Sequence, residues 1–199
     1  MATYTESIEK LIDRLVKLPG IGRRSAERII SYLLDASDSD VEVLVNAIAR
    51  VKENVRSCRI CHNLSETDVC TICTDQRRDH RLLCVVEGPN DVTSLEKTGT
   101  YQGMYHVLMG AIAPLEGKGP GDLKIDSLLN RIKKEQIQEI ILATDSDTEG
   151  ATTALYLTKV LKPFGVNISR IGIGIPAGSN LEYADSATLS MALESRRSL

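Results

Sequence analysis

Four cysteines grouped within sixteen residues constrain this sequence more than any other feature. They form two Cys-x-x-Cys pairs, Cys58 with Cys61 and Cys70 with Cys73, separated by eight residues. Paired thiolates at this spacing close a tetrahedral zinc site that has no open position. Buried, metal-free cysteines are a poor alternative, because the residues around the pairs are too polar for a core. The sequence therefore predicts a structural zinc ion, and we expect His62 to be a solvated neighbour rather than a ligand.

The fifth cysteine, Cys84, lies in an apolar stretch and is expected to be a small core residue. An odd number of cysteines without a signal peptide argues against a disulfide framework. The chain also lacks a basic-then-apolar start and any run of about 18 uncharged apolar residues. These features predict a cytoplasmic protein that is not attached to a membrane.

Short apolar strands alternate with helical patterns from residue 80 onward. The expected strands are 82–86, 105–108, 139–143 and 168–175, and the expected helices are 91–97, 123–134 and 149–161. This alternation is typical of an α/β fold with a mostly parallel sheet covered by helices on both faces. The Gly- and Pro-rich stretch 113–121 is expected to be a surface loop. Its Gly117-Lys118-Gly119 lacks the Ser or Thr of a phosphate-binding loop, which excludes a P-loop ATPase.

Carboxylates follow two of the predicted strands. Glu87 comes directly after one strand, and Asp145 and Asp147 come after another. Because the carboxyl ends of parallel strands meet at one sheet edge, these side chains are expected to lie together, where they suit a Mg²⁺ ion. A structural alternative stays open, in which Asp147 caps the following helix and Asp145 only solvates the end of the strand.

The amino-terminal region predicts a helical hairpin that binds DNA. Apolar residues recur at helical spacing before residue 17, and Pro-Gly-Ile-Gly then separates this helix from one that starts near Arg23. Gly20 and Gly22 let the backbone approach a phosphate, with Arg23, Arg24 and Arg28 close by. The alternative is an ordinary hairpin with solvated arginines. A third helix after residue 37 carries an apolar face, and the three helices are expected to pack together.

The local charge of the amino-terminal region supports DNA binding there, whereas the net charge of the whole chain does not. The formal net charge of −3 gives no overall sign of nucleic-acid binding. Between residues 10 and 34, however, six basic residues stand against two acidic ones. The amino-terminal end is therefore the electropositive one.

The order of these motifs resembles the RecR family of bacterial recombination mediators over nearly the whole chain. The resemblance rests on the hairpin, the four cysteines and the motifs Val85–Val92, Thr98–Leu108 and Leu181–Asp185. It implies a helix-hairpin-helix region at 1–56, a four-cysteine zinc element (a zinc finger) at 57–79, a central Toprim domain at 80–176 and a tail at 177–199 that exchanges between subunits. The stretch 177–180 departs from the usual glycine-rich, acidic sequence of the family, and the details of the tail interface depend on it.

The resemblance also implies the function. Family members are non-catalytic, ring-shaped homotetramers that bind single- and double-stranded DNA without sequence preference, in the bacterial cytoplasm at the nucleoid. They act with RecO and RecF in DNA repair and recombination after DNA damage, helping to load recombinase onto single-stranded DNA at gaps. The family's DNA-contacting positions correspond to Arg24 and Arg28, and Arg23 is an additional basic residue.

One departure favours a competing hypothesis. The chain keeps Glu87, Asp145 and Asp147, whereas family members often lose one or both of the aspartates. The alternative function is therefore a magnesium-dependent Toprim enzyme that cleaves or transfers phosphodiesters. Such an enzyme also needs a nucleophilic tyrosine in a separate domain or a nucleotide-binding region, and no part of the chain is left to supply either. The non-catalytic interpretation is preferred, with Glu87 and Asp147 as part of the surface that meets RecO.

Overall fold

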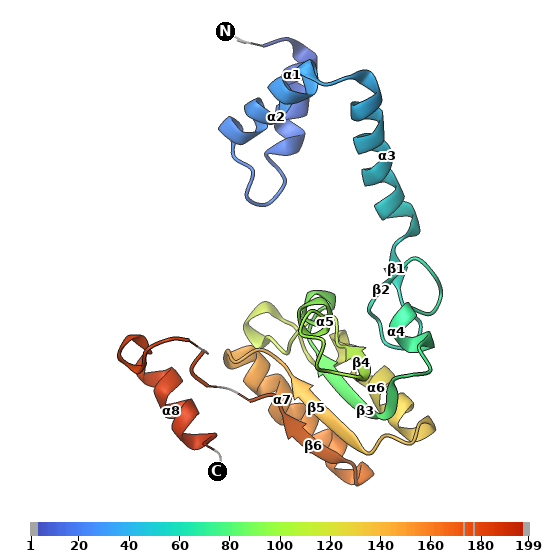
Figure 1. The fold of residues 1–199 in the computed structure, drawn as a ribbon, viewed down its shortest axis with the longest axis vertical. Helices are drawn as coiled ribbons and strands as arrows, with labels where there is room; N and C mark the ends of the chain where they lie inside the picture. Colours follow the sequence, from blue (N-terminus) through green and yellow to red (C-terminus); the bar gives the residue numbers. More distant parts are fainter. Residues whose placement is uncertain (1–3, 173, 177, 197–199) are drawn as a thin grey trace. The chain divides into compact units, whose positions relative to one another are not determined.

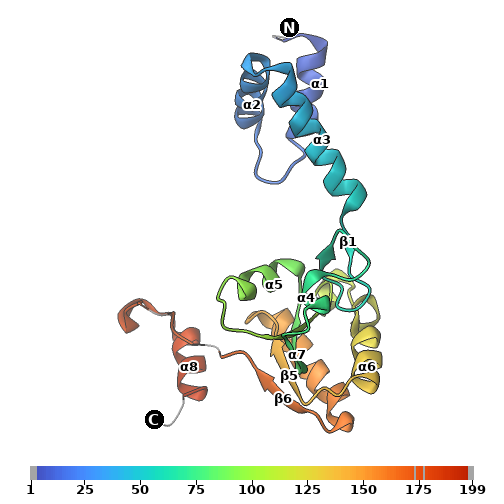
Figure 2. The same cartoon turned by 45° about the vertical axis from the view of Figure 1, so that its right-hand side comes forward.

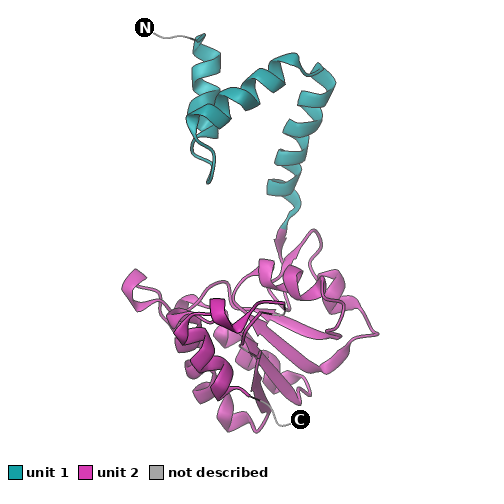
Figure 3. Ribbon diagram, turned by 60° about the vertical axis from the view of Figure 1, so that its left-hand side comes forward, with its two compact units in different colours: residues 1–55 teal, residues 56–199 magenta. Residues whose placement is uncertain are grey.

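The computed structural model describes residues 4–172, 174–176 and 178–196. The chain divides into two compact units, residues 1–55 and residues 56–199 (Figure 3). The α-helices are α1 (Glu6–Leu15), α2 (Arg23–Asp35), α3 (Asp38–Asn54), α4 (Thr71–Thr74), α5 (Pro89–Glu96), α6 (Ile125–Lys134), α7 (Thr148–Leu161) and α8 (Ser186–Glu194). The strands are β1 (Arg56–Ser57), β2 (Leu64–Ser65), β3 (Asp79–Val86), β4 (Gly103–Val107), β5 (Glu139–Ala143) and β6 (Asn167–Arg170).

The first unit has a small core between α1 and α2. Ile12, Ala26 and Ile30 are buried there, and Ile8, Leu15 and Ile21 pack around them. The helix α3 begins as predicted, because the Ser37 hydroxyl accepts a hydrogen bond from the Asp40 amide at 3.2 Å. The expectation that all three helices pack together is wrong for the single chain, since no described residue of α3 is buried.

The second unit contains a four-stranded sheet in the order β4-β3-β5-β6, and every neighbouring pair is parallel (Figure 1). Successive side chains of a strand point to opposite faces. Leu83 and Val85 of β3 accordingly belong to the core on the side of α6 and α7, whereas Cys84 and Val86 belong to a second cluster with Val92 of α5. Helices therefore cover both faces of the sheet, as the sequence predicted.

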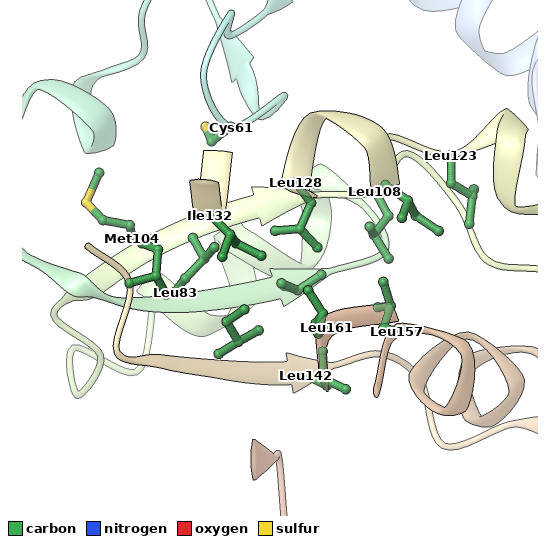
Figure 4. Packing of buried hydrophobic residues seen from close by; sticks show 14 of the residues in the cluster. Cys61, Leu83, Met104, Leu108, Leu123, Leu128, Ile132, Leu142, Leu157 and Leu161 are labelled. Carbon is green, nitrogen blue, oxygen red and sulfur yellow. The ribbon is translucent and has the colours of Figure 1, made fainter. Parts of the chain in front are cut away.

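The larger core joins the sheet to α6 and α7 (Figure 4). Leu128 of α6 and Leu157 and Leu161 of α7 are completely buried against the strand residues Leu83 and Leu142. The two helices lie along one side of the sheet, and α5 lies on the other (Figure 2). Cys84 is buried in the smaller cluster, as expected, and burial raises the pKa of its thiol to about 12.

The last predicted strand is too long. β6 ends at Arg170, because its partner β5 ends at Ala143 and the final rung is the hydrogen bond from the Ile171 amide to the Leu142 carbonyl, 3.0 Å. Residues 171, 172, 174 and 175 of the expected strand are not in a strand, and residue 173 lies outside the described residues. Of the predicted tail, residues 177 and 197–199 also lie outside them. Within the described ranges, no helix is both long and apolar enough to cross a membrane.

Candidate functional site

The hairpin between α1 and α2 is a tight turn built by two sequence features. Pro19 and Gly20 occupy its central positions, Gly20 has a φ of +79°, and the Ile21 amide donates to the Leu18 carbonyl at 3.1 Å. This is the pattern of a type II turn, which requires a residue that tolerates positive φ at its third position. Ile21 then packs against the small core and fixes the turn to the helices.

The start of α2 is open to an anion. Gly22 is the N-cap residue, no side chain among the described residues caps the helix, and no acidic residue stands in its first turn. A Cβ at Gly22 would meet nothing within 4 Å, so the backbone here is accessible. Uncapped amides at the positive end of a helix dipole are suited to bind a phosphate.

The three arginines at this helix start differ in their surroundings. Arg23 donates through Nη2 to both carboxylate oxygens of Glu9 at 3.0 Å, and its Nε lies 3.2 Å from Glu27. The hydrogen bond with Glu9 raises the pKa of Arg23. Arg24 and Arg28 are exposed and have no ion pair within the described part of the chain. Arg23 therefore ties α1 to α2, whereas Arg24 and Arg28, one turn apart, are available to contact a ligand.

The four cysteines of the zinc element converge. Their sulfur atoms all lie within 4.8 Å of one another and are buried. The Sγ atoms of Cys61 and Cys70 are 3.5 Å apart, and those of Cys58 and Cys73 are 4.0 Å apart. A tetrahedral zinc ion with Zn–S bonds of about 2.3 Å places its sulfurs about 3.8 Å apart, so the residues fit the ion.

Electrostatics of the cluster also fit a bound cation. Hydrogen bonds from the Cys61 and Cys73 thiols lower the pKa of Cys70, which favours its thiolate form. The Cys70 amide donates a hydrogen bond to the Cys58 sulfur at 3.3 Å. Zinc supplies the positive charge that allows all four sulfurs to be thiolates together.

His62 is not the solvated neighbour that the sequence suggested. It is half-buried, has a φ of +63°, and its Nε2 lies 2.8 Å from the Ser127 hydroxyl of α6. Its amide donates to the Cys58 carbonyl at 3.0 Å. His62 therefore connects the zinc element to the sheet domain, as an adjacent residue and not as one of the four ligands.

The predicted acidic residues come together at the carboxyl edge of the sheet. β3 and β5 are neighbours, with Val86 paired to Ala143, and the Glu87 carboxylate accepts a hydrogen bond from the Asp145 amide at 3.0 Å. Asp147 caps α7, because its Oδ1 accepts the Gly150 amide at 2.8 Å. Burial raises the pKa of Glu87, and the nearby Asp145 and Asp147 charges raise it further.

Two further residues at this edge escaped the sequence analysis. Arg170, at the end of β6, donates from Nη2 to the Asp145 carbonyl at 3.3 Å. Asp91 accepts the Gly88 amide at 2.7 Å and stabilises the start of α5, and the spacing of three residues is a signal that could have revealed this cap. A shallow cavity of about 380 Å³ lies beside them, lined by Asp91, Ser94, Asp145 and Ile171 among others.

The carboxylates are not gathered as closely as the cysteines. Within the ranges that the structure describes, the four cysteines are the only group of three or more His, Cys, Asp or Glu side chains whose ligand atoms lie within 4.8 Å of one another. Glu87 and Asp147 instead each accept a backbone amide. The structural role of Asp147 is therefore confirmed, and magnesium binding at Glu87, Asp145 and Asp147 stays a prediction.

Family models match four consecutive segments of the chain. They describe a RecR helix-hairpin-helix for residues 8–52, a RecR zinc finger domain with four cysteines for residues 55–75, a Toprim domain for residues 81–172 and a RecR C-terminal region for residues 174–197. The second match and the clustered sulfurs together identify a structural Zn²⁺ site at the four cysteines. The third match confirms the predicted Toprim domain, with its parallel sheet.

Full-length relatives give the same result. The chain is 49% identical over 196 residues to the recombination protein RecR of Thermobifida fusca (strain YX), covering 98% of both chains. It is 47% identical over 199 residues to the recombination protein RecR of Syntrophotalea carbinolica, covering 100% of both chains. The similarity therefore extends from the hairpin to the tail.

Proposed function

This chain belongs to the RecR family of recombination proteins, and on that premise we propose that it is a non-catalytic mediator of recombination in DNA repair. It binds single- and double-stranded DNA without sequence preference as a ring-shaped homotetramer. With RecO and RecF it helps to load recombinase onto single-stranded DNA at gaps. The segments 1–56, 57–79, 80–176 and 177–199 are its DNA-binding region, zinc element, Toprim domain and exchanged tail.

The observation that carries this proposal is the open start of α2. Uncapped amides behind Gly22, together with Arg24 and Arg28, present positive charge that suits the phosphates of the DNA backbone. A Cβ added at Gly20 or Gly22 would meet no atom within 4 Å, so the turn leaves room for a phosphate. Such contacts bind the DNA backbone and ignore its sequence.

The exposed face of α3 supports assembly into a homotetramer. Val45, Ile48 and Val51 are 58%, 64% and 64% exposed, although they belong to the apolar stripe of a long helix. An apolar stripe of this size is costly in water and is normally covered. One hairpin with two available arginines binds DNA weakly, but several copies in one ring add avidity without new contacts.

The surroundings of the carboxylates favour a non-catalytic Toprim domain. Glu87 accepts the Asp145 amide and Asp147 caps α7, so both side chains serve the fold at their present positions. In the alternative, a magnesium-dependent enzyme that cleaves or transfers phosphodiesters, the same residues Glu87, Asp145 and Asp147 would hold the Mg²⁺ ion. Incubating the protein with labelled single- and double-stranded DNA and Mg²⁺ separates the two. Cleavage that is lost in the Asp145→Asn variant would support the enzyme and overturn the mediator.

We further propose that the acidic edge contributes to the RecO-binding surface through Glu87 and Asp147. Reversing both charges to lysine is expected to weaken RecO binding in a pull-down or calorimetric titration. Because Asp147 also caps α7, an Asp147→Ser variant, which retains a capping oxygen, separates lost charge from lost structure. Unchanged RecO binding in the folded double variant would contradict this assignment.

The hairpin is tested by replacing Arg24 and Arg28 together with alanine. The logarithm of DNA affinity falls linearly with the logarithm of salt concentration, by about 0.7–0.9 per phosphate contact, so the slope is expected to decrease by about 1.4–1.8 for each bound hairpin. Arg23→Ala is the matched control, since Arg23 is already paired with Glu9 and Glu27. Wild-type affinity and slope in the double variant would refute the hairpin assignment.

A further inference from the structure

The strand β4 is an edge of the sheet, and edge strands leave backbone groups without a strand partner. The Leu108 amide next to β4 donates to Val86 of β3 at 2.9 Å. Alternate residues face opposite neighbours, so the Val107 amide points outward, away from β3. It donates to the carbonyl of the zinc ligand Cys61 at 2.8 Å. At this position the zinc element thus accepts the hydrogen bond that a neighbouring strand would otherwise accept.

Two arginines pair with the outward carbonyls of the same strand. Arg78 donates through Nη1 to the Gly103 carbonyl at 3.0 Å, and Arg131 through Nη1 to the Tyr105 carbonyl at 2.6 Å. Glu96 pairs with the first guanidinium and Glu135 with the second. Arg131 lies on α6, and Arg78 lies directly before β3, so neither arginine belongs to the segment 58–73 that contains the four cysteines. The Val107 amide differs, because its partner is a cysteine of that segment.

His62 fixes this contact from the other side of Cys61. Its Nε2 is bonded to Ser127 of α6, and its ring lies edge to face with that of His106 on β4, with centroids 5.3 Å apart and an angle of 84°. His106 is completely buried and its Nε2 is bonded to the Lys124 carbonyl at 2.9 Å. The left-handed backbone of His62 is the turn that directs its side chain toward these groups.

We propose that zinc occupancy controls the outer edge of β4. With the ion bound, the segment 58–62 closes this edge at Val107, and His62 is the positioning residue that holds the segment against β4 and α6. When the ion is removed by chelation, the segment separates and the Val107 amide becomes accessible to solvent and to a strand of another chain. The zinc element then covers the edge of the sheet only while the metal is bound, in addition to forming its own local fold.

The segment depends on its metal for a physical reason. Residues 58–73 contain only one two-residue strand and most of a four-residue helix, too little regular structure to hold a shape alone. The sheet, in contrast, has its own core with α6 and α7. Loss of zinc is therefore expected to open the edge without unfolding the centre of the sheet.

Hydrogen–deuterium exchange of the full chain, with and without a zinc chelator under reducing conditions, tests the proposal. Peptides that cover β4 are expected to exchange at least about tenfold faster after chelation, corresponding to the loss of one buried hydrogen bond. Peptides that cover β5 are expected to be unchanged. Faster exchange confined to residues 58–73 would overturn the proposal, and so would equal acceleration in β5.

A variant isolates the role of His62 while zinc stays bound. Asn tolerates positive φ, so His62→Asn removes the ring contacts with little backbone strain. Metal analysis is expected to find one zinc per chain in this variant, with β4 exchange faster than in the wild type. His80→Asn is the matched control, since His80 is exposed on β3. If zinc-loaded His62→Asn exchanges like His80→Asn, His62 does not position the segment and the proposal fails.

Discussion

Gly150 occupies a position where the surrounding backbone leaves no room for a Cβ atom. It lies in the first turn of α7, directly over the loop that carries Asp145 and Asp147. A Cβ at this position would lie 2.8 Å from the amide nitrogen and the carbonyl carbon of Asp145, and nearer still to its carbonyl oxygen. All three are backbone atoms, so no side chain can rotate away. Gly150→Ala must therefore displace the acidic loop or the start of α7.

The expected cost follows from two opposing terms. Overpacking of a tight site costs about 1–3 kcal/mol, and a clash with backbone belongs at the upper end. Alanine recovers up to about 1 kcal/mol over glycine through its higher helix propensity. The Thr144 hydroxyl, which donates to the Gly150 carbonyl at 2.8 Å, and the Asp147 cap are also strained by any shift. We expect Gly150→Ala to destabilise the fold by about 2 kcal/mol, within the range of overpacked sites.

Thermal unfolding followed by circular dichroism, together with hydrogen–deuterium exchange, checks this value. Gly121→Ala is the matched control, because a Cβ at Gly121 meets nothing within 4 Å and its φ is not positive. The control is expected to be neutral or slightly stabilising. In Gly150→Ala the faster exchange should be concentrated in the segment that covers 144–150. A Gly150→Ala protein as stable as the control would refute the close packing of α7 against this loop.

Three further predictions concern buried charge and zinc. Glu96→Gln leaves the Arg78 guanidinium without its carboxylate and is expected to cost about 1–3 kcal/mol in urea unfolding at neutral pH. Burial alone would raise the pKa of Glu96, but hydrogen bonds from Arg78 and Tyr105 lower it overall. The wild type therefore loses this stabilisation as the pH falls through the lowered pKa. A stability difference between wild type and Glu96→Gln that does not change with pH would contradict this prediction. Burial raises the pKa of Glu87, so its charge costs stability once the pH is above that pKa. Glu87→Gln should therefore raise the melting temperature at pH values above this pKa but not below the ordinary pKa of a glutamate, and an equal difference in both ranges would argue against it. Chelation or Cys58→Ser should lower the melting temperature without selectively abolishing DNA binding, and a fully stable, assembled metal-free protein would count against a structural ion.

Features with local causes could be predicted from the sequence. The four cysteines are specified by their spacing, and the structure brings all four together. The strand 139–143 has the predicted bounds, because a short apolar run between polar residues has few alternatives. The Asp147 cap also follows from sequence alone, since it joins residues three positions apart.

Features with distant partners could not be predicted in the same way. The sequence groups Arg23 with Arg24 and Arg28, but the partner of Arg23, Glu9, is 14 residues upstream and comes close only after the hairpin forms. His62 is expected in solvent from its polar neighbours, yet its partner Ser127 is 65 residues away on α6. No periodicity or spacing in the sequence records either contact.

The third helix illustrates a different limit. Helical periodicity correctly predicts an apolar stripe that contains Val45 and Ile48, and a cap at Ser37. It also leads to the expectation that α1 and α2 cover the stripe, which they do not. Periodicity shows that a face is apolar and cannot show whether its partner belongs to the same chain or to another copy.

The central claim is that copies of this chain assemble around DNA, and the mass in solution tests it most directly. Light scattering coupled to size exclusion, with and without single-stranded or duplex DNA, is expected to give four times the mass of the chain, with DNA added to the complex when it is present. The variant with Arg24 and Arg28 replaced by alanine should keep the fourfold mass and bind DNA more weakly. A chain that stays monomeric at every concentration, with or without DNA, would contradict the account.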